Sequence, residues 1–348
     1  MKNHFKILTP SLLILSILFT ACERDQMPPL IPPSTGGDTT LNILAGSESG
    51  AYAANSAFID FSTDIISTSG RASWDVAFYC GSDFKVGLNY KTVALTKQIN
   101  KNDLTNVTAA DTIGMALSLS YSSTDFELLD SFSGNLEYTK IPVNTTAADN
   151  KVFIVQRGTG AGIAAKPWYK IRVLKNSNIS YTLQYARITE TTFKTIEITK
   201  DNNYNFKFVS FDNGLVLSEP KKDDWDIQYT AAVYKFPMGP VEIPYIFSDM
   251  VLINYLGGVQ AAQVLNTQFS YNTITLANAQ SLTYSNDRWA IADKWRTSTS
   301  SPTAGVKTDR FYVIKDQIDN YYKLKFISFH NTEGGTRGKP KIAYELIK

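Results

Sequence analysis

The sequence predicts a mostly β protein, built as two tandem antiparallel β units with few short helices. From Leu41 onward, short runs rich in Val, Ile, Thr, Tyr and Phe alternate with turn residues, and these residue types favour strands. A strand that opens with Trp-Asp occurs once in each half, at Trp74–Tyr79 and Trp225–Tyr229. Both halves also end in three similar strands, at 152–155, 168–174 and 181–188 and again at 311–314, 321–327 and 341–347.

The Trp-Asp stretches follow the alternation of half-buried strands. Trp225, Ile227 and Tyr229 are expected on one face, with Asp226, Gln228 and Thr230 on the other. Trp74, Val76 and Phe78 follow the same pattern in the first half. The similarity indicates one β unit used twice, and the alternative is a single large sandwich with chance similarity.

The predicted domain organisation has four parts. Residues 1–21 are a signal peptide, 22–45 a flexible tether, 46–200 a first β domain and 201–348 a second, with the boundary near Thr199–Asn203. Asn213–Gly214, between two apolar runs, predicts a hairpin turn. Two short helices are expected, at 259–265 and within 285–295, the latter with Asn286 or Asp287 near its N-cap.

The N-terminus has the features of a lipoprotein signal. Lys2 to Lys6 form a basic start and Ile7 to Phe19 a short apolar stretch, followed by Thr-Ala-Cys22. The apolar stretch is too short for an ordinary membrane span. Cys22 resembles the acylated first residue of a bacterial lipoprotein, the alternative being a plain signal peptide with a chance Cys. Pro and Gly dominate the segment that follows, as in a tether.

Composition excludes several function classes. The formal charge is +2, and removing Lys2 and Lys6 with the leader leaves 32 basic and 32 acidic residues, so nucleic acid is not expected as a partner. His4 lies in the leader, so His330 is the one His that remains, and a zinc site is not expected. With Cys22 acylated, Cys80 is expected as a buried free thiol.

Catalytic motifs are also missing. A Ser-His-Asp triad would need His330, which lies in an expected turn, and no Gly-x-Ser-x-Gly motif accompanies it. The glycines of 158–162 lie between two expected strands, which favours a hairpin loop over a phosphate loop. Asp223, Asp224 and Asp226 are close in sequence, but their position around a strand start favours a structural role. We therefore expect no enzyme.

Two methionines are candidate ligands. Met238 lies between Pro237 and Gly239 in an expected turn, where it has little core to fill. An exposed thioether there can be a contact residue or a soft axial ligand for haem iron. Met250 lies in an apolar strand, and core packing competes with a ligand role for it.

An ordered set of motifs resembles the HmuY-type haem-binding lipoproteins of Gram-negative anaerobes. The resemblance rests on Trp225–Ile227, the run from Asp249 to Val264, Phe311–Ile314, Tyr322–Phe326 and Tyr344–Ile347, and it is fainter over 53–188. It implies an all-β protein that holds haem between loops and passes it to an outer-membrane receptor. Family members use two His or two Met as axial ligands. The resemblance therefore implies haem as cofactor, with a Met238–Met250 pair or a mixed Met–His330 pair as ligands.

The resulting hypothesis is a non-catalytic lipoprotein, lipid-anchored at the outer membrane and exposed at the cell surface, that binds haem or a related porphyrin for iron acquisition. Its expected partners are haem or a haem-carrying protein and a TonB-dependent outer-membrane receptor. The alternative is an adhesion module that binds glycan or protein without haem. A saturable haemin response would separate the two.

Overall fold

Antiparallel sheets dominate the computed structural model, which describes residues 32–130, 136 and 139–348. The predicted signal peptide and Cys22 lie outside the described residues. Residues 33–348 form one unit, and no helix in the described part is long and apolar enough to cross a membrane. The mostly β fold class is confirmed.

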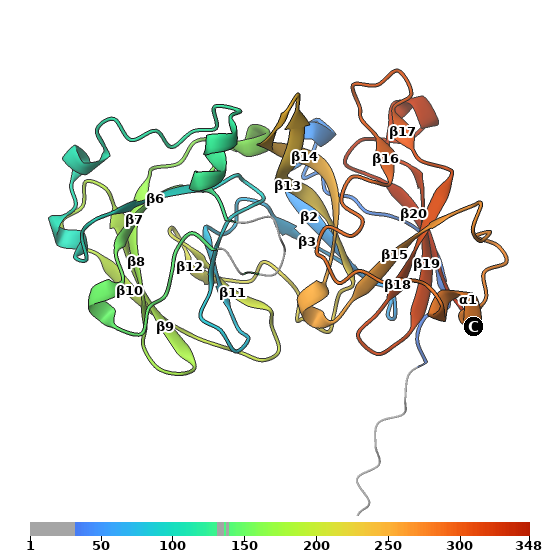
Figure 1. Cartoon of the computed structure of the whole chain (residues 1–348), viewed down its shortest axis with the longest axis horizontal. Helices are drawn as coiled ribbons and strands as arrows, with labels where there is room; N and C mark the ends of the chain where they lie inside the picture. Colours follow the sequence, from blue (N-terminus) through green and yellow to red (C-terminus); the bar gives the residue numbers. More distant parts are fainter. Residues whose placement is uncertain (1–31, 131–135, 137–138) are drawn as a thin grey trace, which may run out of the picture. The chain divides into compact units, whose positions relative to one another are not determined.

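One five-stranded antiparallel sheet is formed by consecutive strands of the middle of the chain, in the order β10-β9-β8-β7-β6 (Figure 1). Its central strands are the runs expected at 152–155, 168–174 and 181–188, because alternating apolar residues give each a buried face. Its members are β6 (Leu95–Ile99), β7 (Val152–Gln156), β8 (Tyr169–Lys175), β9 (Ser180–Arg187) and β10 (Lys194–Thr199).

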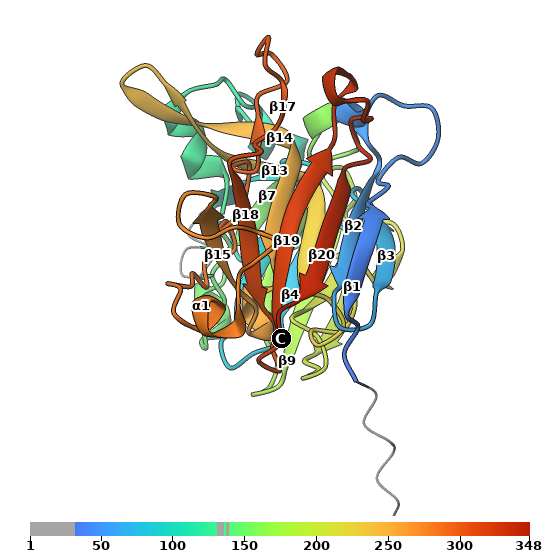
Figure 2. The same cartoon turned by 90° about the vertical axis from the view of Figure 1, so that its right-hand side faces the viewer.

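A second five-stranded sheet has the order β1-β20-β19-β18-β15 and is seen face on in Figure 2. The strands expected at 311–314, 321–327 and 341–347 are its centre. Its members are β1 (Gly36–Thr40), β15 (Gln260–Leu265), β18 (Arg310–Lys315), β19 (Tyr321–Ser328) and β20 (Lys341–Leu346). A two-stranded sheet lies nearby, with β16 (Arg296–Thr297) and β17 (Gly305–Val306).

The β1 strand corrects the expected tether. Residues 36–40 pair with β20 over five residues, and Leu41 and Ile43 are fully buried in the core beside it. Gly36 adopts φ +93°, and a Cβ there would lie 2.2 Å from the Tyr344 carbonyl oxygen. The prediction of a flexible segment over 22–45 is therefore wrong for 36–45, because strand pairing by β1 and the apolar residues Leu41, Ile43 and Leu44 anchor it.

Two four-stranded sheets join the first half of the chain to the second. One has the order β14-β13-β2-β3 and the other β12-β11-β4-β5. In the first, β13 pairs with β2, and in the second, β11 pairs with β4. Their members are β2 (Asn55–Asp60), β3 (Ile65–Gly70), β4 (Val76–Tyr79), β5 (Val86–Leu88), β11 (Phe206–Ser210), β12 (Gly214–Val216), β13 (Ile227–Met238) and β14 (Val241–Ile253).

The two related units thus exchange their first strands. The β2–β3 hairpin precedes the first Trp-Asp strand but pairs with the second, whereas β11–β12 precedes the second and pairs with the first. β1 and β10 occupy corresponding places: β1 precedes the β2–β3 hairpin and pairs with β20 near the end of the second half, and β10 precedes the β11–β12 hairpin and pairs with β9 of the first half. The division at residue 200 is therefore not that of the structure. A central lobe spans 71–219, and an outer lobe combines 33–70 with 220–348.

Separate cores support these lobes. One hydrophobic cluster draws only on 41–61 and 227–344, and another only on 76–211. A third cluster joins Val233 of β13 to residues of 93–154, so the lobes also share apolar contacts. The buried Cys80 is a free thiol, as expected, and Asn213–Gly214 closes the β11–β12 hairpin.

The Trp-Asp segments are the same structure twice, with one departure from the expected alternation. Asp75 accepts a hydrogen bond from Phe211 N, and Asp226 accepts one from Phe61 N, each 2.7 Å long and each directed to the exchanged hairpin. Trp225 does not share the face of Ile227 and Tyr229. It packs edge-on against Phe58, and Trp74 likewise packs on Phe208. Each Trp precedes its strand at a bend, where the two-residue period does not apply.

Helices are short in the described residues. Neither expected helix is present: 260–265 is strand β15, stabilised by pairing with β18, and 285–295 is a series of turns. Sheet pairing overrides the local helix preference of Gln260–Gln263. The helical elements are α1 (Leu276–Gln280), η1 (Gly50–Tyr52), η2 (Leu104–Asn106), η3 (Ala109–Thr112), η4 (Ser123–Leu128), η5 (Ala147–Asp149), η6 (Gly160–Gly162), η7 (Tyr255–Gly257) and η8 (Asn331–Glu333).

Candidate binding site

The β13–β14 hairpin carries Met238 at its tip. β13 ends at Met238, β14 begins at Val241, and Gly239 between them adopts φ +61°, a conformation that glycine accepts without steric cost. β13 pairs with β2 only over Ile227–Tyr229. Beyond that point the hairpin continues as a two-stranded ribbon that projects from the sheet (Figure 2).

One face of this ribbon is an aromatic strip, which we define as Phe236, Met238, Val241, Tyr245 and Phe247. The register places these side chains on one face, because Met238 lies opposite Val241, and Phe236, Tyr245 and Phe247 follow at even-numbered steps. The same face also carries Ile243, which lies opposite Phe236 and is buried. The three rings contact one another, with centroids 5.2–6.2 Å apart. Met238 is 49% exposed, Val241 46%, Tyr245 39% and Phe236 38%. Apolar exposure of this kind, gathered on one projecting element, is typical of a contact surface.

The surroundings of the strip hold it in place. Tyr121, from the loop before η4, lies 6.4 Å from Tyr245. At the base of the ribbon Tyr234 stacks on Trp289, with centroids 4.4 Å apart. The opposite face carries the exposed pair Lys235–Glu242, with 3.3 Å between Nζ and Oε1. Near its tip the ribbon is therefore apolar on one face and charged on the other, whereas nearer its base Val233 and Ile246 of the second face pack against the third cluster.

The three predicted ligand residues lie in three different environments. Met250 is fully buried beside Ala232, Leu252, Trp289 and Ala292, so it is a core residue. It pairs with Thr230, and along β14 it lies about 25–30 Å from the hairpin tip at roughly 3.3 Å per residue. The structure therefore does not bring Met238 and Met250 to one metal ion.

His330 is the N-cap residue of η8, and its Nδ1 lies 3.0 Å from Thr332 Oγ1. Figures 1 and 2 both place this turn away from the β13–β14 tip, so the structure does not support a mixed Met238–His330 pair either. In the described part of the chain, no group of three or more His, Cys, Asp or Glu side chains is arranged to hold a metal ion. Met238 is the one predicted ligand whose thioether is accessible, at the end of an apolar surface.

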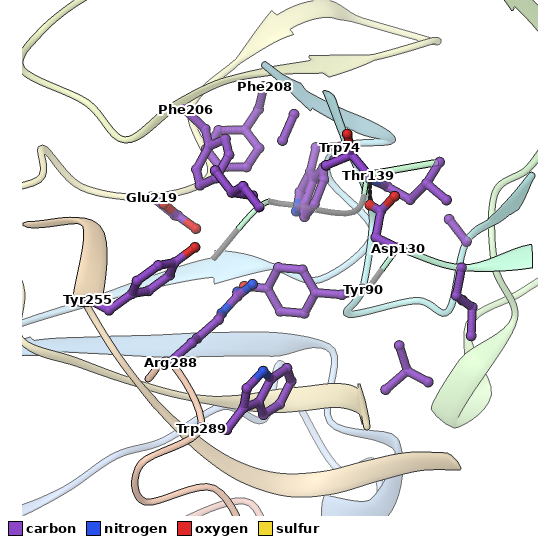
Figure 3. A pocket seen from close by; sticks show the side chains of 17 residues that line it. Trp74, Tyr90, Asp130, Thr139, Phe206, Phe208, Glu219, Tyr255, Arg288 and Trp289 are labelled. Carbon is purple, nitrogen blue, oxygen red and sulfur yellow. Dashed lines mark hydrogen bonds between the residues drawn. The ribbon is translucent and has the colours of Figure 1, made fainter. Parts of the chain in front are cut away.

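A second candidate site lies between the lobes, and we call it the interlobe pocket. The central lobe supplies its aromatic wall from Trp74, Phe206 and Phe208, whereas the outer lobe supplies Tyr255, Arg288 and Trp289 (Figure 3). Its volume is about 80 Å³, which is below the size of typical sites for drug-sized ligands, roughly 300–1,000 Å³. The pocket therefore does not fit a porphyrin, and none of the described residues that line it carries a thioether or an imidazole.

Charged groups enter the interlobe pocket without forming ion pairs within 4 Å among the described residues. The Arg288 guanidinium lies over the Tyr90 ring, 4.0 Å from its centroid, and Glu219 lines the same space. Burial raises the pKa of Glu219, partly offset by the nearby charges of Lys91 and Arg288. Burial also raises the pKa of Asp130 to about 6, although two backbone N–H donors, of Leu88 and Lys140, oppose that shift. These shifts reflect a weakly solvated site.

Sequence reasoning found the hairpin tip but missed this pocket. Trp74 was noticed as part of the Trp-Asp strand, but nothing local marks Tyr90, Glu219 or Arg288. They are distant in sequence and belong to both lobes. Only the docking of the lobes brings them together.

Comparison with known proteins identifies the family. A family model described as "HmuY protein" matches residues 53–344. The match begins at the end of η1 and ends in β20, so it covers both lobes as one unit and most of the chain. The chain therefore belongs to the HmuY family. No curated protein and no solved structure matches it.

Proposed function

We propose that this chain is a non-catalytic surface lipoprotein that binds haem or a related porphyrin for uptake, with the aromatic strip as the binding surface. The observation that carries the proposal is the exposed Met238 thioether at the end of three contacting aromatic rings. Membership of a family that includes haem-binding proteins supports the ligand class. A thioether is a soft ligand for haem iron, and aromatic rings cover a porphyrin face well.

The strip supports reversible binding. It offers one thioether, and Met250 and His330, the other predicted ligands, lie elsewhere. Phe236 and Tyr245 are both more than a third exposed, so an apolar ligand would remove existing apolar surface from water, at about 25 cal/mol per Å². A single axial ligand on an open surface suits a protein that takes haem from a carrier and hands it to a receptor. We propose a TonB-dependent outer-membrane receptor as that recipient.

Lipidation at Cys22 would supply the anchor. Because Ser34 and Thr35 are already hydrogen-bonded to the outer lobe, the spacer available to a lipidated Cys22 is residues 23–33 rather than the longer tether expected from the sequence. Fully extended, it spans at most about 40 Å. That reach is enough to present the lobes at the outer face of the membrane.

The test is a haemin titration of the chain from Cys22 onward, with Cys22 replaced by Ser, followed by the Soret band. We expect saturable binding in the unchanged strip. Met238→Leu retains the apolar surface but removes the sulfur, so it should shift the Soret maximum and weaken binding about tenfold or more. Met250→Leu is the matched control and should leave the spectrum unchanged. The proposed haem site would be refuted if the unchanged protein showed no saturable Soret response, or if Met238→Leu gave the same spectrum and affinity as the unchanged protein.

The alternative of a glycan- or protein-binding adhesion module rests on the same surface. The strip projects from the sheet and has Tyr121 at its side, a geometry that also suits a flat partner. Binding on a glycan array that is lost in Tyr245→Ala, together with no haemin response, would favour this alternative.

A further inference from the structure

Buried hydrogen-bond donors gather around the interlobe pocket without protein acceptors. Trp74 Nε1, Lys91 Nζ and Gln228 Nε2 have no acceptor among the described residues, and all three residues are at most 2% exposed. A buried polar group without a partner costs about 1–3 kcal/mol. Trp74 lines the pocket itself. Gln228 and Lys91 lie behind Tyr90, whose hydroxyl donates to Gln228 Oε1 at 2.9 Å and whose ring centroid is 5.8 Å from Lys91 Nζ.

The charge in this region is positive. Lys91, Arg288 and the buried Arg71 act on one another and on the Glu219 carboxylate. The Asp130 carboxylate also lines the pocket, so groups of both signs lie here, with the three cations more numerous than the two carboxylates. Arg71 donates to the carbonyl oxygens of Ala53, Lys91 and Ala161, which satisfy its hydrogen bonds but leave its charge uncompensated. The buried donors without acceptors, together with the Arg288 guanidinium, which forms no ion pair among the described residues, favour an acceptor that carries negative charge.

The walls of the pocket are flat and apolar. Trp74 and Phe208 contact edge-on, with centroids 4.9 Å apart, and Phe206 lies 6.0 Å from Phe208. Figure 3 shows Trp74, Phe206 and Phe208 on one side of the space and Tyr90, Arg288 and Trp289 on the other. A volume of about 80 Å³ limits the ligand to at most one ring, because an apolar cavity of about 150 Å³ is known to hold benzene.

We propose that the interlobe pocket binds a small aromatic carboxylate, with its carboxylate toward Arg288 and Trp74 Nε1 and its ring between the aromatic walls. The guanidinium fork matches a planar carboxylate. A phosphate would carry more charge into walls that are mainly apolar, so the carboxylate is the better match. Burial raises the pKa of Glu219, which weakens its opposition to an anion, whereas the positive charges of Lys91 and Arg288 act in the other direction.

The probe is sodium benzoate, titrated by isothermal calorimetry into the chain from Cys22 onward, with Cys22 replaced by Ser. Benzamide and benzamidine have the same ring without the negative charge. We expect saturable binding of benzoate, and at least about tenfold weaker binding of the neutral and cationic analogues. Saturable benzoate binding that exceeds both analogues would support the proposal.

Variants then locate the site. Arg288→Gln should weaken benzoate binding about ten- to a hundredfold, the range for a lost charge-assisted hydrogen bond. Trp74→Phe retains a ring but removes the donor, and should weaken binding about fivefold or more. Arg310→Gln is the matched control, because Arg310 pairs with Asp309 on β18, away from the pocket, and should leave binding unchanged.

No saturable benzoate binding by the unchanged protein would overturn the proposal, as would equal binding of benzamidine or an unaltered affinity in Arg288→Gln. Haemin binding at the aromatic strip involves none of these side chains. Either proposal can therefore be refuted while the other holds. Arg288→Gln should weaken benzoate binding and keep haemin binding, which distinguishes the two sites.

Discussion

The two Trp-Asp motifs have the same backbone geometry but opposite electrostatic environments, so the same substitution should have different effects in the two copies. Asp75 accepts from Arg157 Nε at 2.7 Å and Nη2 at 2.9 Å as well as from Phe211 N, and both side chains of this ion pair are 2% exposed. Asp226 accepts from Phe61 N alone, and its Oδ1 is buried without a partner among the described residues. Burial raises the pKa of Asp226 well above its ordinary value.

The magnitudes follow from these contacts. Asp75→Asn directs an amide donor at the buried guanidinium of Arg157, which retains only Asp212 as an ionic partner. Breaking one side of a buried ion pair costs about 3–5 kcal/mol, and we expect about 3 kcal/mol because Asp212 remains. Asp226→Asn retains an oxygen for Phe61 N and removes a poorly solvated carboxylate. Its cost should be below about 1 kcal/mol, and it can stabilise the fold.

Urea unfolding at pH 7, followed by circular dichroism, measures both variants. The pH dependence is a second test of Asp226. Because its folded pKa is raised, the folded state binds the proton more tightly than the unfolded state, so the unchanged protein loses stability as pH rises from about 4 toward the folded pKa. The Asp226→Asn variant should not show this loss of stability with rising pH. Equal costs for Asp75→Asn and Asp226→Asn would refute the reasoning.

Three further predictions concern Lys91, Met250 and Gly36. Burial lowers the pKa of Lys91 to about 7, so the unfolded state binds more protons above that pH, and stability should rise between pH 7 and about 10. Lys91→Met should be more stable at pH 6, by on the order of 3 kcal/mol, and the advantage should shrink by pH 9 in urea titrations. Met250→Ala should cost about 2–5 kcal/mol by leaving a cavity, with the Soret maximum of the folded protein unchanged. Gly36→Val should cost at least about 2 kcal/mol in the same unfolding assay, because its backbone is left-handed and its Cβ would meet the Tyr344 carbonyl; an unchanged midpoint would mean that β1 does not contribute.

The local sequence predicted strands correctly where apolar and polar residues alternate regularly. The central strands of both five-stranded sheets follow clean alternation, and each was expected within one or two residues of its observed bounds. Alternation failed at Trp74 and Trp225, which precede their strands. It also failed at 260–265, where the Gln and Ala residues permit a helix and pairing with β18 selects a strand.

Of the two candidate sites, one was indicated by the local sequence and the other was not. Met238 could be singled out because Pro237 and Gly239 beside it already indicate a turn, and a turn gives a Met little to pack against. The distance between Met238 and Met250 follows from the register of the β13–β14 hairpin, which the sequence alone did not fix. No local sequence pattern indicated the interlobe pocket. Arg288 and Glu219 are distant in sequence, and they line one pocket only because the two lobes pack together.

The sequence by itself determined that this protein is mostly β, that it repeats one unit, and that it belongs with the HmuY-type proteins. Only the tertiary structure decided which hairpin pairs with which Trp-Asp strand. Both Trp-Asp segments offer the same strand edge and the same aspartate acceptor, Asp75 or Asp226, so local chemistry does not distinguish the partners. The exchange was settled by long-range packing, which buries Leu41 and Ile43 in the outer lobe and creates the pocket between the lobes.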